Sequence, residues 1–138
     1  MKVEKLDHIH VYCCDPEASV AFYRDHFEGT EVLRDKDDQG QPTIFLALGG
    51  QLLYITAFPA GMFPAEPPVA GDGAYTHGFG VAHFGLRVLD VEAAVRELAD
   101  AGVRVLGGPT HKDTGLVYAY IEAPDGVVVE LTQYETTA

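Results

Sequence analysis

The chain has 138 residues, with 9 Lys and Arg against 21 Asp and Glu, which gives a formal net charge of −12. Its length suits one domain with its own hydrophobic core, and its charge repels phosphate backbones and anionic membrane surfaces. We therefore expect no nucleic-acid and no membrane partner. The N-terminus lacks the apolar run of a signal peptide, and no later stretch has the roughly 20 apolar residues of a membrane span. The expected location is cytoplasmic.

The first module of the chain covers about residues 4–58. Residues 6–12 alternate between two faces, as a β-strand does. Asp15 followed by Pro16 is the start signal of a helix, whose apolar stripe ends before Gly29. Strand-like runs follow at residues 31–34, 43–48 and 52–56. The predicted order of elements is β-α-β-β-β.

The stretch 57–80 that follows is rich in Pro, Gly and aromatic residues. A connection of that length inside a compact domain is a lid over a binding site, a dimer contact or a solvated connector. The sequence leaves these three alternatives open, and the linker proper is taken as residues 59–79.

The second module, about residues 80–134, repeats the plan of the first. When His83 is placed on His8, Asp90 falls on Asp15, and the helix that Asp90 caps again ends at a glycine. Strand-like runs follow at residues 103–106, 116–121 and 127–132. Two copies of β-α-β-β-β predict an α+β fold.

The repeat puts two histidines, His8 and His83, at one structural position in two copies of a module. Copies packed about a pseudo-twofold axis bring equivalent positions together, and two imidazoles that meet are half of a metal site. Glu130 stands among apolar residues of the last strand, where a buried carboxylate must be paired, protonated or bound to a metal. Its counterpart in the first module is Tyr54. The candidate metal ligands are therefore His8, His83 and Glu130.

The chain contains the segments DHIHVYCCDPEASVAFYRDHF, VAHFGLRVLDVEAAVRELADAGV and EAPDGVVVELTQ. In these segments it resembles the vicinal oxygen chelate superfamily, which includes glyoxalase I, methylmalonyl-CoA epimerase, fosfomycin-resistance thiol transferases, bleomycin-binding proteins and extradiol ring-cleaving dioxygenases. The resemblance implies that the modules pair into a curved, partly closed eight-stranded sheet around a cavity for a divalent metal. It puts the usual ligand positions of the family on His8, Tyr54, His83 and Glu130.

The chain departs from part of this family at Tyr54, where glyoxalases and epimerases generally have Glu or Gln. A phenol with a pKa of about 10 is a poor ligand for a divalent ion at neutral pH. The two histidines and one carboxylate that remain are a ligand set of non-haem Fe(II) and oxygen chemistry, and they resemble the extradiol dioxygenase pattern. A fosfomycin-type transferase with Mn(II) would use the same three ligands, but the tail after Glu130 has no Arg or Lys to hold a phosphonate.

The run HKDTGLVYAYIEAPDGVVVE resembles an extradiol dioxygenase segment that carries a His, an Asn and a Tyr near the metal, with Asp113 in place of the Asn. The resemblance makes His111 a catalytic residue that moves a proton and Tyr120 a catalytic residue that hydrogen-bonds the substrate. His111 equally fits a surface loop, and Tyr120 a core aromatic. The residues expected to line the substrate pocket are His10, Tyr54 and Tyr118.

The resulting hypothesis is a single-domain metalloenzyme, residues 1–138, that cleaves a catechol or a related small molecule with vicinal oxygens. Fe(II) is the favoured ion, and Mn, Ni, Co and Zn are the alternatives because all of them accept imidazole and carboxylate. A lyase or isomerase of the glyoxalase or epimerase type is the second interpretation. A metal-dependent thiol transferase and a metal-free drug-binding protein are the remaining ones. A homodimer is expected, because a second copy of the chain would bury exposed sheet edges and apolar linker residues.

Overall fold

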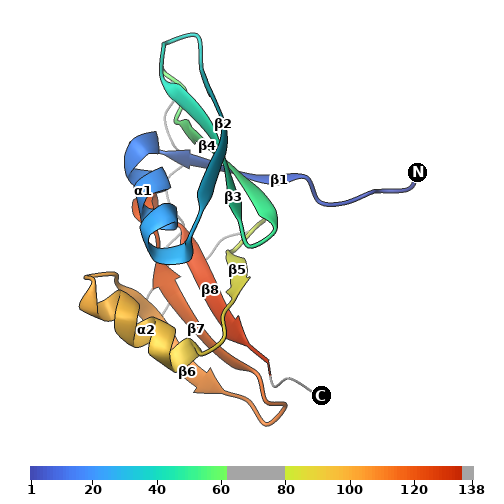
Figure 1. Ribbon diagram of the computed structural model, residues 1–138, viewed down its shortest axis with the longest axis vertical. Coiled ribbons are helices and arrows are strands. Elements are labelled where there is room, and N and C mark those ends of the chain that lie inside the picture. Colours follow the sequence, from blue (N-terminus) through green and yellow to red (C-terminus); the bar gives the residue numbers. More distant parts are fainter. Residues whose placement is uncertain (62–79, 135–138) are drawn as a thin grey trace. The chain divides into compact units, whose positions relative to one another are not determined.

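The protein consists of two compact units, Met1–Pro64 and Ala65–Ala138. The computed structural model describes residues 1–61 and 80–134, and in each unit these residues form one α-helix and one four-stranded sheet (Figure 1). The predicted β-α-β-β-β modules and the α+β class are confirmed. Residues 62–79 of the linker lie outside the described residues, so its three alternatives stay predictions.

Unit 1 builds its sheet in the order β1-β4-β3-β2, with β1 parallel to β4 and the other neighbours antiparallel. Helix α1 connects β1 to β2 and packs on β3 and β4. The first and last strands of the module are therefore neighbours. The elements are β1 (His8–Cys13), α1 (Pro16–Phe27), β2 (Thr30–Lys36), β3 (Pro42–Leu48) and β4 (Gln51–Ala57).

Unit 2 repeats this arrangement as β5-β8-β7-β6, again with the first strand parallel to the last. Helix α2 packs on β6, β7 and β8. The shared strand order agrees with the sequence repeat. The expected eight-stranded, partly closed sheet is wrong in one respect, because the described strands form two four-stranded sheets, each of them open. The elements are β5 (Phe84–Arg87), α2 (Val91–Asp100), β6 (Val105–His111), β7 (Val117–Glu122), a 3-10 turn (Pro124–Gly126) and β8 (Val128–Gln133).

Each sheet has a helix face, which packs on the helix of its own unit, and an opposite helix-free face. Strand alternation assigns the residues to these faces, because neighbouring residues of a strand point to opposite sides. The helix faces hold the buried core, which includes Ile44, Leu46 and Ile55 in unit 1 and Ala119, Ile121 and Leu131 in unit 2. The helix-free faces hold His8, His10, Phe45 and Tyr54 in unit 1 and Gly85, Tyr118, Tyr120 and Glu130 in unit 2.

Both helices begin where the sequence predicts. The Asp15 carboxylate accepts hydrogen bonds from the backbone N–H groups of Glu17 at 3.0 Å and Ala18 at 3.2 Å. Asp90 caps α2 in the same way and accepts from the N–H of Ala93 at 3.0 Å. These bonds satisfy donors that the first turn of a helix leaves without a partner, so each aspartate fixes the start of its helix.

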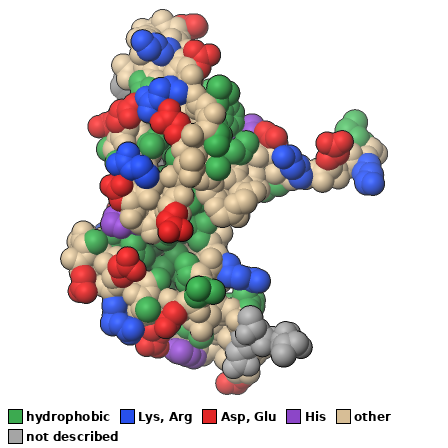
Figure 2. Space-filling view, viewed as in Figure 1, with side chains coloured by type: hydrophobic (Ala, Val, Ile, Leu, Met, Phe, Trp, Pro, Cys, Tyr) green, Lys and Arg blue, Asp and Glu red, His purple; other side chains and the backbone are tan. Residues whose placement is uncertain are grey.

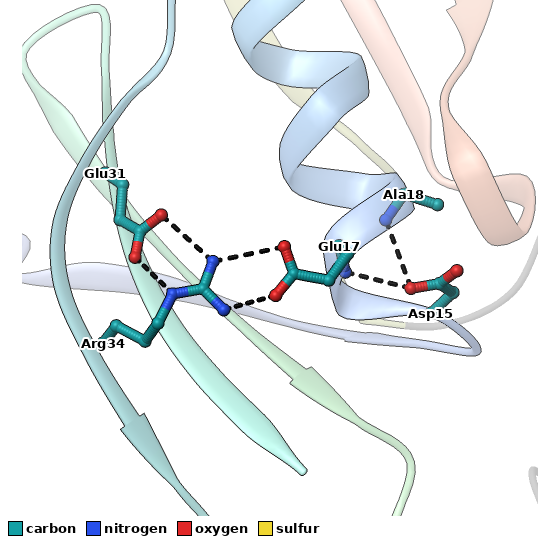
Figure 3. A network of polar contacts seen from close by, with 5 residues as sticks. All are labelled: Asp15, Glu17, Ala18, Glu31 and Arg34. Carbon is teal, nitrogen blue, oxygen red and sulfur yellow. Dashed lines mark hydrogen bonds and ion pairs between the residues drawn. The ribbon is translucent and has the colours of Figure 1, made fainter.

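Arg34 on β2 links the sheet of unit 1 to the start of α1. Its guanidinium lies between the carboxylates of Glu31 and Glu17, as Figure 3 shows. It donates to Glu31 at 2.5 and 3.1 Å and also contacts both oxygens of Glu17. The hydrogen bond from Arg34 holds the pKa of the Glu31 carboxyl below its usual range.

Replacing Arg34 with Gln should lower the melting temperature slightly at neutral pH, because Glu17 and Glu31 lose their cation. The depressed pKa of Glu31 means that this stabilisation is complete above the ordinary Glu pKa and is lost as pH falls through the folded-state pKa. Thermal denaturation of both proteins across the acid range measures the difference. Lys36→Gln removes a cation of the same strand that forms no ion pair within the described residues, and it should show no such trend. A difference that does not change with pH would contradict the prediction.

Strand β6 is longer than predicted. The sequence indicates residues 103–106, whereas the strand spans Val105–His111 and shifts its register with β7 on both sides of Gly107. Gly108 has a φ of +84°, and a Cβ added to it would lie 2.7 Å from the carbonyl oxygen of Tyr118. Glycine is needed where the backbones approach so closely. The Gly-Gly-Pro sequence therefore marks a bulged strand that continues rather than a strand end.

Charged side chains cover much of the surface. Figure 2 shows Asp and Glu spread over the visible face among Lys and Arg, as expected for a chain with a net charge of −12. Among the described residues, no helix is long and apolar enough to span a membrane.

Candidate functional site

His83 and Glu130 meet on the helix-free face of unit 2. The Nε2 atom of His83 lies 3.0 Å from Oε2 of Glu130, and the two side chains are 26% and 19% exposed. Glu130 on β8 is in register with Gly85 of β5 and with Tyr120 of β7, so all three share one face. Two of the three predicted metal ligands thus lie together within one unit.

The other contacts of His83 are made by its ring. Its second ring nitrogen, Nδ1, is buried and has no hydrogen-bond partner among residues 1–61 and 80–134. Its ring meets the Tyr120 ring edge-on, with 5.3 Å between the centroids. A buried polar atom without a partner costs stability. His83 Nδ1 is therefore left for a partner outside the described residues.

His8 begins β1 on the helix-free face of unit 1. Its Nδ1 atom lies 2.8 Å from Oδ2 of Asp7, and its side chain is 38% exposed. A carboxylate beside Nδ1 favours the tautomer that leaves the lone pair on Nε2, as is common for metal-binding histidines. The hydrogen bond with His8 also lowers the pKa of the Asp7 carboxyl. Asp7 is not among the residues predicted from the sequence, although its position next to His8 is a usable signal.

Tyr54 belongs to an aromatic row on the helix-free face of unit 1. The Tyr54 ring stacks on Phe45, with centroids 4.3 Å apart and planes 17° from parallel, and it contacts His10 at 4.8 Å. His10 contacts Tyr12 at 4.6 Å, and Tyr12 contacts Phe58 at 5.2 Å. Tyr54 and His10, both expected to line the pocket, are therefore neighbours in a continuous row of rings, which His8 joins through contacts with Phe45 at 5.8 Å and Tyr54 at 6.0 Å.

His10 is held in the aromatic row as a neutral group. Its Nε2 atom lies 2.8 Å from the hydroxyl oxygen of Thr56 on the neighbouring strand β4. Burial lowers the pKa of His10, and the nearby His8 adds to the effect. Since an ordinary His pKa is already below 7, His10 carries no charge at neutral pH. The aromatic row therefore presents an uncharged surface that suits a planar ring.

The remaining predicted residues of unit 2 lie on two different faces of its sheet. Tyr118 and Tyr120 share the helix-free face, with their ring centroids 5.8 Å apart. His111, in contrast, is in register with the buried Val117, and its Nε2 atom lies 2.8 Å from Oε1 of Glu92 on α2. His111 thus stands on the helix face, opposite the face that carries Tyr120.

The sequence model of the Glyoxalase/Bleomycin resistance protein/Dioxygenase superfamily matches residues 5–131. The chain belongs to this superfamily. The chain is also similar in sequence, over nearly its whole length, to the ethylmalonyl-CoA/methylmalonyl-CoA epimerase of Cereibacter sphaeroides. It is 31% identical over 137 residues, which cover 95% of this chain and 98% of the epimerase.

Solved structures of the glyoxalase superfamily have the same fold. The fosfomycin resistance protein FosX from Listeria monocytogenes, crystallised with Mn(II) and sulfate, is 16% identical with a TM-score of 0.69, covering 98% of this chain and 96% of FosX. TnmS3, an antibiotic binding protein from Streptomyces sp. CB03234, is 23% identical with a TM-score of 0.70, covering 98% of this chain and 99% of TnmS3. At these identities the likeness concerns the fold alone, and one fold carries several functions.

Proposed function

We propose that the protein is a metal-dependent enzyme and that His8, His83 and Glu130 hold its divalent ion. The observation that carries the proposal is the contact between Nε2 of His83 and Oε2 of Glu130, two ligand-type atoms 3.0 Å apart. Two donors that lie about 2.1 Å from one ion, at right angles to each other, are about 3.0 Å apart. The contact is a hydrogen bond in this structure, and the same separation allows the two atoms to share an ion.

His8 is the third ligand in this proposal. The repeat makes it the counterpart of His83, and Asp7 orients its imidazole as outer carboxylates orient metal-bound histidines. Among the described residues, no three His, Cys, Asp or Glu side chains are grouped closely enough to hold a metal ion. His8 therefore enters the proposal through the repeat and through its Asp7 partner.

The reaction that this ligand set favours is oxidative ring cleavage of a catechol or a related molecule with vicinal oxygens, with Fe(II) as the ion. Tyr54 supports the choice, because its ring stacks on Phe45 at 4.3 Å and so serves as part of the aromatic row rather than as a fourth ligand. Two histidines and one carboxylate leave coordination positions for other groups. When bound, Fe(II) supplies Lewis-acid and redox chemistry at those positions.

In this proposal the side chains of the protein bind and orient the substrate. The aromatic row offers its rings to a planar substrate, and neutral His10 adds no charge there. The hydroxyl of Tyr120 donates a hydrogen bond to a substrate oxygen beside Glu130. His111 takes no part in proton transfer here, because its imidazole bonds Glu92 on the helix face. The homodimer and the cytoplasmic location remain predictions.

A second candidate is an epimerase or lyase reaction, which the 31% identity with the ethylmalonyl-CoA/methylmalonyl-CoA epimerase favours. In such a reaction a base removes a proton next to a carbonyl group. The family resemblance leads us to expect Glu or Gln at the position of Tyr54 in these enzymes. This candidate ranks second because a stacked phenol replaces that side chain.

Metal content and oxygen uptake test the proposal together. Protein purified anaerobically should contain iron close to one ion per chain by mass spectrometry, and it should consume oxygen when supplied with a catechol. His83→Ala should lose the metal, whereas His111→Ala, which removes an imidazole from the helix face, should keep it. Nickel, cobalt or zinc without oxygen uptake would favour the epimerase type. Failure to take up any added divalent ion would contradict the proposal and favour a binding protein.

A further inference from the structure

Arg87 is the one arginine of the chain that forms no ion pair within the described residues. The other four each contact a carboxylate: Arg24 with Asp25, Arg34 with Glu17 and Glu31, Arg96 with Glu92, and Arg104 with Glu122. Acidic residues outnumber basic ones by 21 to 9, so carboxylates are plentiful around an exposed guanidinium. An arginine that no carboxylate of residues 1–61 and 80–134 pairs can bind an anion from outside.

Arg87 stands on the same face as the proposed metal ligands of unit 2. It ends β5 and is in register with Thr132, which lies two residues beyond Glu130 on β8. Its guanidinium lies over the ring of Tyr134, 4.3 Å from the centroid. Stacking of this kind holds the flat face of the guanidinium and leaves the N–H groups at its edge for an anion. The side chain is thus positioned without being neutralised.

Lys112 supplies a second cation to this region. Its Nζ atom lies 5.9 Å from the ring centroid of Tyr118, which is in register with Thr132. Lys112, too, forms no ion pair in the part of the chain that the structure describes. Arg87, Thr132 and Tyr118 form a row across three adjacent strands, a width of roughly 10 Å. Two cations therefore flank a hydroxyl and a phenol.

We infer that Arg87 and Lys112 form a subsite for an anionic group of the substrate, a carboxylate or a phosphoryl group. The inference rests on the proposed function, which puts the reacting oxygens beside His83 and Glu130. Thr132 is about 7 Å along β8 from Glu130, so the anionic group and the reacting oxygens lie in adjacent rows of one face. Arginine binds both oxygens of such a group with its fork of donors, and lysine adds a point charge. The substrate class is therefore an acid or a phosphate ester.

A subsite with Arg87 differs from the expectation that the chain has no cation to hold an anion near Glu130. The tail after Glu130 has no Arg or Lys, which argues against a site for an anion. The cation comes instead from β5, which the parallel pairing puts beside β8. Glu130 lies one row away on the same face, and an ion bound there would offset its negative charge.

Binding of inorganic phosphate tests the subsite directly. Protein passed over a chelating resin is titrated with phosphate at constant ionic strength, and the arginine Nε–Hε signals are followed by NMR. The Arg87 signal should shift and saturate, whereas the Arg96 signal should not respond. Arg87→Gln should weaken phosphate binding about tenfold, the loss expected for one charged hydrogen-bonding partner. Arg96→Gln, a matched loss of charge on α2, should bind phosphate like the wild-type protein.

The outcomes separate this inference from the proposed function. No saturable shift at Arg87, or an equal shift at Arg96, would overturn the subsite whatever the metal content of the protein. Saturation by phosphate in a protein that takes up no metal would leave the subsite standing and remove the proposed function. A parallel titration with acetate identifies the group: tighter phosphate binding supports a phosphoryl substrate, and tighter acetate binding supports a carboxylate.

Discussion

Glu130→Ala protein should bind divalent metal more than about 100-fold more weakly than the wild-type protein, and it should lose turnover with the metal. Glu130 is the only carboxylate of the three proposed ligands, and its side chain is just 19% exposed, so water cannot easily replace its charge. Loss of an outer partner of a metal ligand costs roughly 10- to 100-fold in affinity, and loss of a ligand itself costs more. Metal titration and metal content by mass spectrometry measure the effect.

Thermal denaturation gives a second readout that does not depend on turnover. An ion that binds the folded protein alone raises its stability with the logarithm of the ion concentration over Kd. The melting temperature of the wild-type protein should therefore rise when Fe(II) is added anaerobically, and that of Glu130→Ala should not. Glu92→Ala is the matched control, because Glu92 also bonds an imidazole, that of His111, but on the helix face. Its melting temperature should rise like that of the wild type. An equal rise in Glu130→Ala would refute the ligand assignment.

Local signals account for the parts of the fold that could be predicted. Asp15 and Asp90 cap their helices through bonds to residues two or three positions further on, so a short window of sequence contains the whole cause. Strand alternation likewise assigned His8 and His10 to one face of β1. The repeat extended both inferences to the second module, because equal patterns lead to equal topology.

The face of His111 could not be predicted, because it depends on the pairing of two strands. The register of β6 with β7 shifts on both sides of Gly107, and each shift changes which residues face the helix. The alternation of residues within β6 does not predict these shifts, because they arise from its pairing with β7. The availability of Arg87 is equally non-local, since it follows from the parallel pairing of β5 with β8 and from the place of Tyr134 at the end of β8.

His8→Ala tests whether the first module supplies a ligand to a centre shared with the second. We expect it to lower metal affinity as strongly as His83→Ala, although the His83–Glu130 contact at 3.0 Å lies wholly within unit 2. Two protein donors on one sheet hold an ion weakly. A third protein donor adds a further bond to the ion and so raises its affinity. The metal content of the purified variant measures this dependence.

His10→Ala is the control for His8→Ala, because His10 lies two residues further along β1 on the same face and bonds Thr56 instead of a carboxylate. It should keep its metal and raise the KM for a planar substrate, since it removes one ring from the aromatic row. If His8→Ala keeps its metal, the ion is held by unit 2 alone. If both His8 and Glu130 bind one ion, each single variant already destroys the site, and His8→Ala combined with Glu130→Ala should lose no further affinity.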